Sequence, residues 1–315
     1  MTSRSLTHRS LTYRTLTYEV DGRVARITLD RPNRGNGITL TMPQELAACV
    51  ERADLDPKVH VIALSGNGKG FCGGYDLVAS AEGHMGELTD AAEAPPPGSP
   101  LDPEVQLRNH NPSEVWDPMV DFQMMNRNVR GFMSLFHADK PVVCKVHGFC
   151  VAGGTDMALC SDLLVIADDA KIGYPPARVW GVPTTAVWVH RIGLEKAKRL
   201  LFTGDCLNGI EAVAWGLAIE SAPPDELDER FEVLLERIAR VPVNQLVMHK
   251  KLLNQTVMTQ GLYSTQALGV MFDGVARHTP EGYKFAERAA SHGFKAAVRE
   301  RDEPFGDVGP STHKG

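Results

Sequence analysis

The segment from Pro141 to Asp162 constrains the fold most strongly, because it joins a strand, a glycine-rich bend and an apolar helix. Pro141–Val146 (PVVCKV) predicts a buried strand, and GFCVAGGTDMALCSD follows it. A bend built from glycine leaves backbone N–H groups free to point at a ligand, and the helix dipole adds positive charge there. Asp156 lies in the first turn of this helix. The arrangement suits an oxygen that becomes negative during a reaction.

A second glycine-rich segment occurs earlier in the chain. Lys58–Ser65 (KVHVIALS) alternates like a half-buried strand, and Gly66–Leu77 (GNGKGFCGGYDL) follows it. Glycines in one strand–helix turn often serve only tight packing, so either segment alone is weak evidence. Two such segments in one chain point more firmly to a ligand.

The two segments together resemble the crotonase superfamily, which contains the enoyl-CoA hydratases and isomerases. DRPNRGNGI (Asp30–Ile38), DAKIGYPPARVWGVP (Asp169–Pro183) and RLLFTGDCLNGIEAVAWGLA (Arg199–Ala218) also match, in the order of the family. The resemblance extends from about Thr17 to about Arg301. It implies an α/β fold, a crotonase-like spiral of ββα repeats with a helical C-terminal region. Periodicity alone predicts α/β followed by helices.

The resemblance and the local patterns predict three regions. Residues 1–15 form a flexible lead-in, although their Ser, Thr and Arg content is also typical of a transit peptide. Residues 16–220 form the spiral core, and residues 221–315 form a helical assembly region. The Pro-rich residues 80–121 are an insertion, expected as a loop or lid over the acyl end of the pocket. Strands are expected at Leu16–Val20, Val24–Leu29 and Leu163–Ala167, and helices at Thr41–Ala53, Phe122–Phe136, Leu194–Phe202, Gly209–Trp215, Glu226–Ala239, Val243–Gln255 and Gly261–Arg277.

The resemblance assigns roles to the residues of both glycine-rich segments. The backbone N–H groups of Tyr75 and Gly153 would hold the thioester oxygen, and the Tyr75 side chain would matter little. Asp156 occupies the position of the first catalytic glutamate of a hydratase, although an acid there also complements the helix dipole. The expected substrate-binding residues are Arg34, Gly35, Asp76, Leu77, Tyr174 and Arg178.

The main departure from the family is Pro176, which stands where hydratases carry their second glutamate. Proline has no acid, base or hydrogen-bonding side chain, so the matched residues do not supply two-carboxylate activation of water. Tyr174 could donate a proton, whereas Arg178 cannot act as a base at ordinary pH. The other candidates are His137, His147 and the insertion acids Glu114, Asp117 and Asp121.

Composition restricts the partners and the compartment. The formal net charge of −6 argues against nucleic acid, and the best apolar run is interrupted by Lys145, Asp156 and Asp162, which argues against a membrane. The six cysteines show no CxxC spacing and no metal-ligand set, which favours a reducing, cytoplasmic location. No cofactor is expected beyond the coenzyme A of the substrate.

The expected activity is that of an acyl-CoA-thioester enzyme, nominally an enoyl-CoA hydratase, in a homotrimer or a dimer of trimers. Isomerisation, thioester hydrolysis or C–C cleavage on the same scaffold are alternatives, because each uses a stabilised enolate. Pro176 also leaves open a CoA-thioester-binding protein without catalysis.

Overall fold

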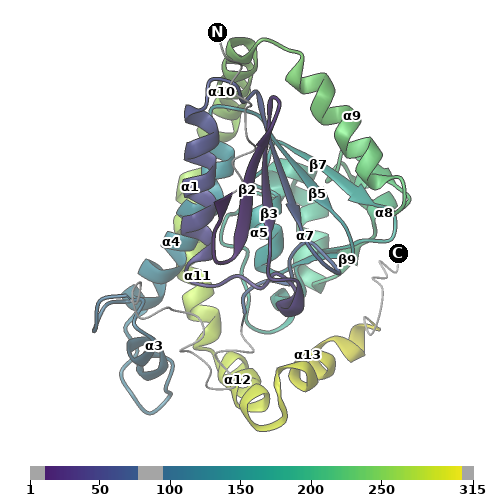
Figure 1. Ribbon diagram of the computed structural model, residues 1–315. Coiled ribbons are helices and arrows are strands. Elements are labelled where there is room, and N and C mark those ends of the chain that lie inside the picture. Colours follow the sequence, from purple (N-terminus) through teal and green to yellow (C-terminus); the bar gives the residue numbers. More distant parts are fainter. Residues whose placement is uncertain (1–10, 77–94, 307–315) are drawn as a thin grey trace.

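The computed structural model describes residues 11–76 and 95–306, which form a twisted sheet covered by helices on both faces (Figure 1). The strand order of the larger sheet is β1-β2-β3-β4-β5-β7-β10, antiparallel among the first three strands and parallel beyond them. Its strands are β1 (Leu11–Thr12), β2 (Leu16–Asp21), β3 (Val24–Leu29), β4 (Val61–Gly66), β5 (Val142–Val146), β7 (Leu163–Ala167) and β10 (Glu220–Ala222). The smaller sheet contains β6 (Phe149–Val151), β8 (Lys171–Gly173) and β9 (Cys206–Leu207).

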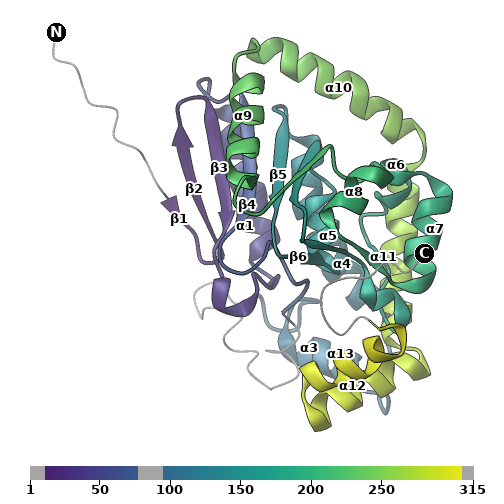
Figure 2. The ribbon, with the colours of Figure 1, turned by 90° about the vertical axis from the view of Figure 1, so that its right-hand side faces the viewer.

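Helices cover both faces of the larger sheet. Helix α1 (Met42–Leu55) and helix α4 (Pro118–His137) pack together on one face, and α9 (Leu227–Ala239) lies across the other (Figures 1 and 2). The sheet is therefore buried on both sides, which explains the near-continuous apolar sequences of its parallel strands. The remaining helices are α3 (Pro103–Asn109), α5 (Gly153–Ala158), α6 (Trp188–Ile192), α7 (Leu194–Thr203), α8 (Gly209–Trp215), α10 (Val243–Thr259), α11 (Leu262–Arg277), α12 (Pro280–His292) and α13 (Phe294–Asp302).

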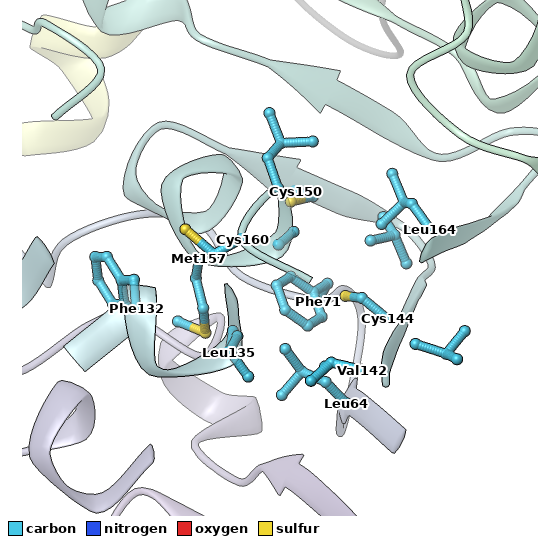
Figure 3. Packing of buried hydrophobic residues seen from close by; sticks show 14 of the residues in the cluster. Leu64, Phe71, Phe132, Leu135, Val142, Cys144, Cys150, Met157, Cys160 and Leu164 are labelled. Atoms are coloured by element: carbon cyan, nitrogen blue, oxygen red, sulfur yellow. The ribbon is translucent and has the colours of Figure 1, made fainter. Parts of the chain in front are cut away.

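The hydrophobic core lies between the parallel strands and helices α4 and α5. Figure 3 shows Leu64 and Val142 from neighbouring strands in one cluster with Phe132 and Met157, and all four side chains are fully buried. Burying each such side chain contributes about 1.5–3 kcal/mol to stability. Phe71, from the first glycine-rich segment, belongs to the same cluster, so the core fixes the position of that segment.

The predicted elements are largely confirmed, with shifted ends. The hairpin turns at Gly22, whose φ of 57° is in the left-handed region that glycine tolerates. Helix α4 begins at Pro118, four residues earlier than expected, because Asp117 caps it by accepting a hydrogen bond from Met119 N–H. The sequence patterns did not single out α12 and α13 beyond Arg277.

The described part of the expected lead-in is attached to the sheet. Leu11 pairs with Tyr18 across β1 and β2. The Glu45 carboxylate accepts hydrogen bonds from the amides of Arg14 and Thr15, at 2.8 and 3.0 Å. Residues 11–15 are therefore part of the folded core, which extends the fold upstream of the expected boundary.

The described part of the insertion packs against the C-terminal helices of the same chain. It contains α3 and the first turn of α4, where an irregular loop was expected. The Trp116 ring stacks on His278 with centroids 4.5 Å apart, and His110 lies against Tyr283 at 5.4 Å. Residues 80–94 of the insertion lie outside the described residues. No helix in residues 11–76 and 95–306 is long and apolar enough to cross a membrane.

Candidate active site

The two glycine-rich segments run side by side. The amide of Phe71 donates to the His147 carbonyl at 3.1 Å. Cys72 pairs with Cys150, because its amide donates to the Phe149 carbonyl at 3.1 Å and its carbonyl accepts from Val151 at 3.0 Å. The strand pairing that the sequence could not reveal thus brings both turns to one place.

The Tyr75 amide faces away from Ile38, its partner in an isolated β-bridge. Gly74 and Asp76 bracket Tyr75 and exchange hydrogen bonds with Ile38, at 2.8 Å from Ile38 N to Gly74 O and 3.0 Å from Asp76 N to Ile38 O. In a parallel bridge of this kind, the N–H of the central residue points to the opposite side. The Tyr75 N–H is therefore directed away from Ile38.

The close approach of the two turns depends on glycine. Gly74 has a φ of 98°, and a Cβ placed on it would lie 2.8 Å from the Ala152 Cβ and 3.4 Å from the Gly153 nitrogen. Ala152 itself has φ 54° and ψ −131°, a strained conformation for a residue with a side chain. Helix α5 begins at the next residue, so the Gly153 amide is one of its free N-terminal donors. The backbones of the two turns therefore lie in contact beside the amides of Tyr75 and Gly153.

Asp156 is completely buried in α5, beneath this contact. Its Oδ1 accepts hydrogen bonds from Thr185, at 2.8 Å from Oγ1 and 3.2 Å from the amide. Its Oδ2 is buried without a hydrogen-bond partner among the described residues. Burial raises the pKa of Asp156 from 3.8 to about 7, against the lowering effect of the Thr185 hydrogen bonds. Asp156 can therefore both take and release a proton near neutral pH.

Other acidic side chains surround Asp156. Burial and the charge of Asp156 raise the pKa of both Tyr75 and Tyr174 well above the usual value. The Tyr174 hydroxyl donates to the Val182 carbonyl at 2.9 Å. Burial also raises the pKa of Asp273 on α11, and that carboxylate acts on Asp156, Tyr75 and Tyr174 alike. The expected site residues Tyr75, Asp156 and Tyr174 are therefore neighbours in the fold.

The insertion reaches this cluster through an ion-pair network. Asp121 is the last residue of the insertion, and its Oδ1 is 3.0 Å from Nη2 of Arg277. The same nitrogen is 3.3 Å from Oδ2 of Asp273. Asp121 is buried and accepts hydrogen bonds from Trp116 and Asn109 as well. Its carboxylate is thus committed to holding the insertion on α11.

The expected substrate-binding residues Arg34, Gly35 and Asp76 lie together beside the first turn. Asp76 forms ion pairs with Arg31 and Arg34, at 2.8 and 3.2 Å, and its own side chain is nearly buried. The Arg34 side chain keeps 37% of its surface exposed, so it can still meet a phosphate. Gly35 packs near the Phe149 ring, with 3.5 Å between that ring and a Cβ placed on the glycine. Leu77 lies outside the described residues.

Arg178 has other partners, which favour a structural role for it. Its guanidinium side chain is 1% exposed, pairs with Asp302 at 3.0 Å and Asp205 at 3.3 Å, and donates to the Thr203 carbonyl. These contacts tie the end of α13 to the core. Pro176 lies in the same 3-10 turn, Pro175–Arg178, with its ring against Gly181 and no group for proton transfer.

Several residues with a clear role at the site carried no signal in the sequence. Asn36 has a φ of 52°, and its side-chain amide donates to the carbonyls of Asn67, Gly70 and Phe71, which fixes the first glycine-rich turn. Only its place between glycines in DRPNRGNGI could have indicated it. Thr185 has no motif of its own and is recognised only by its contact with Asp156.

The remaining proton-transfer candidates of the sequence have other contacts. His147 bonds the Gly68 carbonyl at 2.9 Å, and His137 bonds the Tyr263 hydroxyl at 3.2 Å. Asp117 caps α4. Within the described ranges no group of three His, Cys, Asp or Glu side chains could hold a metal ion.

Comparison with known proteins agrees with this geometry. The family model for enoyl-CoA hydratase/isomerase matches residues 19–95 and 121–292, and the gap in this match falls in the insertion. The crystal structure of an enoyl-CoA hydratase from Mycobacterium smegmatis has 55% sequence identity and a TM-score of 0.87, covering 95% of this chain and 96% of that one.

Relatives known from sequence agree as well. EchA13 of Mycobacterium tuberculosis, which is named as an enoyl-CoA hydratase, is 32% identical over 253 residues, or 76% of this chain and 73% of that protein. The (E)-benzylidenesuccinyl-CoA hydratase of Thauera aromatica is 28% identical and covers 86% of this chain and 96% of its own. The fold is that of the crotonase superfamily, and the chain belongs to the enoyl-CoA hydratase/isomerase family of acyl-CoA enzymes.

Proposed function

We propose that this enzyme adds water to a 2-enoyl-CoA thioester through an enolate that is stabilised by the amides of Tyr75 and Gly153. The observation that carries the proposal is the meeting of the two glycine-rich turns above a buried Asp156 with one free carboxylate oxygen. Two N–H donors aimed at the thioester oxygen stabilise charge that develops there, and in a buried site they act more strongly than in water.

Asp156 is the proposed base for the attacking water. The free Oδ2 is the one oxygen of its carboxylate that can accept a proton without breaking a hydrogen bond to Thr185. With a pKa of about 7, a large fraction of Asp156 is ionised at neutral pH. Isomerisation, thioester hydrolysis and C–C cleavage share the enolate, and they differ in which atom receives the proton.

Pro176 is the observation that favours a slow or altered reaction. It supplies no second carboxylate, and one well-placed acid or base contributes about 10²–10⁴-fold to a rate. We therefore expect crotonyl-CoA hydration to be slower than in a two-glutamate enzyme by a factor in that range, unless another side chain acts in place of the second acid.

The test is a hydration assay with crotonyl-CoA and longer 2-enoyl-CoA thioesters, followed by loss of the absorbance of the conjugated thioester. The Gly153→Pro variant removes one amide donor at the first position of α5, and the Tyr75 ring must shift to admit the proline, because a Cβ there would lie 2.8 Å from Tyr75 Cε2. It should lose thioester chemistry while keeping its circular dichroism spectrum. Binding of the thioesters without turnover, or full activity of the variant, would contradict the proposal.

The exposed surface of two C-terminal helices supports the proposed homo-oligomer. Helices α10 and α11 expose large apolar side chains, which suits burial against further copies of the chain in a homotrimer or dimer of trimers. Light scattering in solution measures that state. The exposed apolar residues of α10 and α11 are Met248, Leu252, Leu253, Tyr263, Leu268, Phe272 and Val275.

The cysteines are all free and buried, which fits a reducing compartment such as the cytoplasm.

A further inference from the structure

The Tyr75 side chain lies at the proposed oxyanion site with its hydroxyl uncommitted. A Cβ placed on Gly153 would lie 2.8 Å from Tyr75 Cε2, so the ring rests directly on the glycine whose amide faces the thioester oxygen. The side chain as a whole is half-buried, and its hydroxyl is at the buried end, without a hydrogen bond among the described residues. A buried hydroxyl without a partner is uncommon, and it calls for an explanation.

Two more unpartnered polar atoms lie in the same part of the molecule. Asp156 is three residues after Gly153, so both lie on the same side of α5. Within the part of the chain that the structure describes, its Oδ2 and the hydroxyl of Thr184 are buried without hydrogen bonds, like the Tyr75 hydroxyl. A group of unpartnered donors and acceptors of this kind can hold a water molecule or a polar substrate atom.

Three charged side chains and one amide act on the Tyr75 hydroxyl. The charges of Asp156 on α5 and Asp273 on α11 favour the neutral phenol, whereas the Asn128 amide on α4, as a hydrogen-bonding group, and the charge of Arg277 on α11 favour the phenolate. Because burial is the largest effect, the pKa of Tyr75 is well above 10 and the hydroxyl keeps its proton at rest. The side chain can therefore donate a proton to an enolate, and Asn128 stabilises the phenolate that results.

We propose that Tyr75 is a catalytic proton donor, which supplies the second proton-transfer group that Pro176 lacks. The inference rests on the proposed hydration. Water forms a bond to C3 as Asp156 Oδ2 takes one of its protons, and the C2–C3 π electrons move into the thioester as an enolate. The Tyr75 hydroxyl protonates C2 as the enolate collapses. Asp156 then returns its proton to the phenolate, so one molecule of water has been added.

The experiment compares Tyr75→Phe with a matched control, Tyr18→Phe. Tyr18 in β2 also carries a buried hydroxyl without a partner, but it lies beside Arg52 and Asp56, outside the candidate site. Tyr75→Phe should lower kcat for hydration at least a hundredfold, with KM within about threefold. It should also stop exchange of the C2 hydrogens of butyryl-CoA in D2O. Tyr18→Phe should keep kcat and exchange.

The outcomes separate the two proposals. Folding of Tyr75→Phe is checked by its melting temperature, which should change little, because the substitution keeps the ring that packs on Gly153 and removes only the hydroxyl. A wild-type kcat in Tyr75→Phe, or an equal loss in Tyr18→Phe, would overturn the role of Tyr75 while leaving hydration intact. A wild-type protein that neither hydrates enoyl-CoA nor exchanges C2 hydrogens would overturn both.

Discussion

The Asp156→Asn variant should be more stable than the natural protein above neutral pH and much less active. The substitution keeps the size of the side chain and the acceptor that binds Thr185. It removes a carboxylate that is completely buried. Activity should fall by about 10²–10⁴-fold, because the amide cannot accept a proton from water.

The sign of the stability change follows from the pKa. Asp156 titrates at about 7 in the folded protein and near 3.8 when exposed. Between these values the folded state holds a proton that the unfolded chain has released, so the stability of the natural protein falls as the pH rises through this range. Above pH 7 the loss reaches about 4 kcal/mol and then stays constant. The asparagine variant has no such loss.

The size of the net gain depends on Oδ2. In the variant an amide nitrogen with two N–H donors takes the place of this unpartnered oxygen, which carries one O–H donor when it is protonated, and the additional buried donor without an acceptor costs about 1–3 kcal/mol. Subtracting that cost leaves a gain of about 1–3 kcal/mol near pH 8. Near pH 4, where Asp156 is protonated in the folded state, the variant should be less stable than the natural protein by about 1–3 kcal/mol.

Urea unfolding followed by tryptophan fluorescence, at about pH 4 and about pH 8 and at one protein concentration, measures both differences. Asp102→Asn is the control. Asp102 is an exposed helix cap with a lowered pKa, and asparagine caps helices equally well, so it should give no gain near pH 8. If Asp156→Asn lost stability by the same amount at both pH values, the carboxylate would not be charged and buried as argued.

Three further predictions concern other parts of the protein. The kcat should rise with pH through about 7 as Asp156 ionises, and a profile that falls over this range would contradict its role as base. Arg178→Met removes the buried partner of the carboxylates of Asp205 and Asp302, which keep Arg199 and Arg301, and urea unfolding should show a loss of about 1–3 kcal/mol. Asn36→Gly keeps the left-handed backbone but removes hydrogen bonds to three carbonyls, so kcat should fall at least tenfold; unchanged kinetics would show that the turn does not need them.

The sequence predicted the parts of the fold that depend on local pattern. Strand β7 and helix α8 have the bounds expected from periodicity. Helices α12 and α13 were missed because their sequences are strongly polar, so only a few buried apolar side chains, such as Phe285, Ala289 and Ala297, mark their inner faces. The insertion was expected as a loop because it is rich in proline, yet Pro103 and Pro118 each occupy the first position of a helix, which proline favours.

The site could be predicted only as far as single residues reveal their role. Arg178 was expected at the substrate because it lies two residues after Pro176, but Asp302, its partner, is 124 residues away along the chain. Thr185 is 29 residues from Asp156. Such contacts depend on how the chain folds back on itself, and no local pattern encodes them.

Several unfavourable features of the structure lie where the chemistry is proposed. Ala152 is strained between the two turns, and buried atoms of Tyr75, Asp156 and Thr184 have no hydrogen-bond partner among the described residues. A chain selected only for stability would pair or remove these groups. Substituting Tyr75 by Phe or Asp156 by Asn should therefore raise or keep stability near pH 8 while lowering activity, whereas truncating core residues such as Phe132 should lower both. A substitution that lowers activity without lowering stability identifies a catalytic site more directly than loss of activity alone, because damage to the fold would lower both.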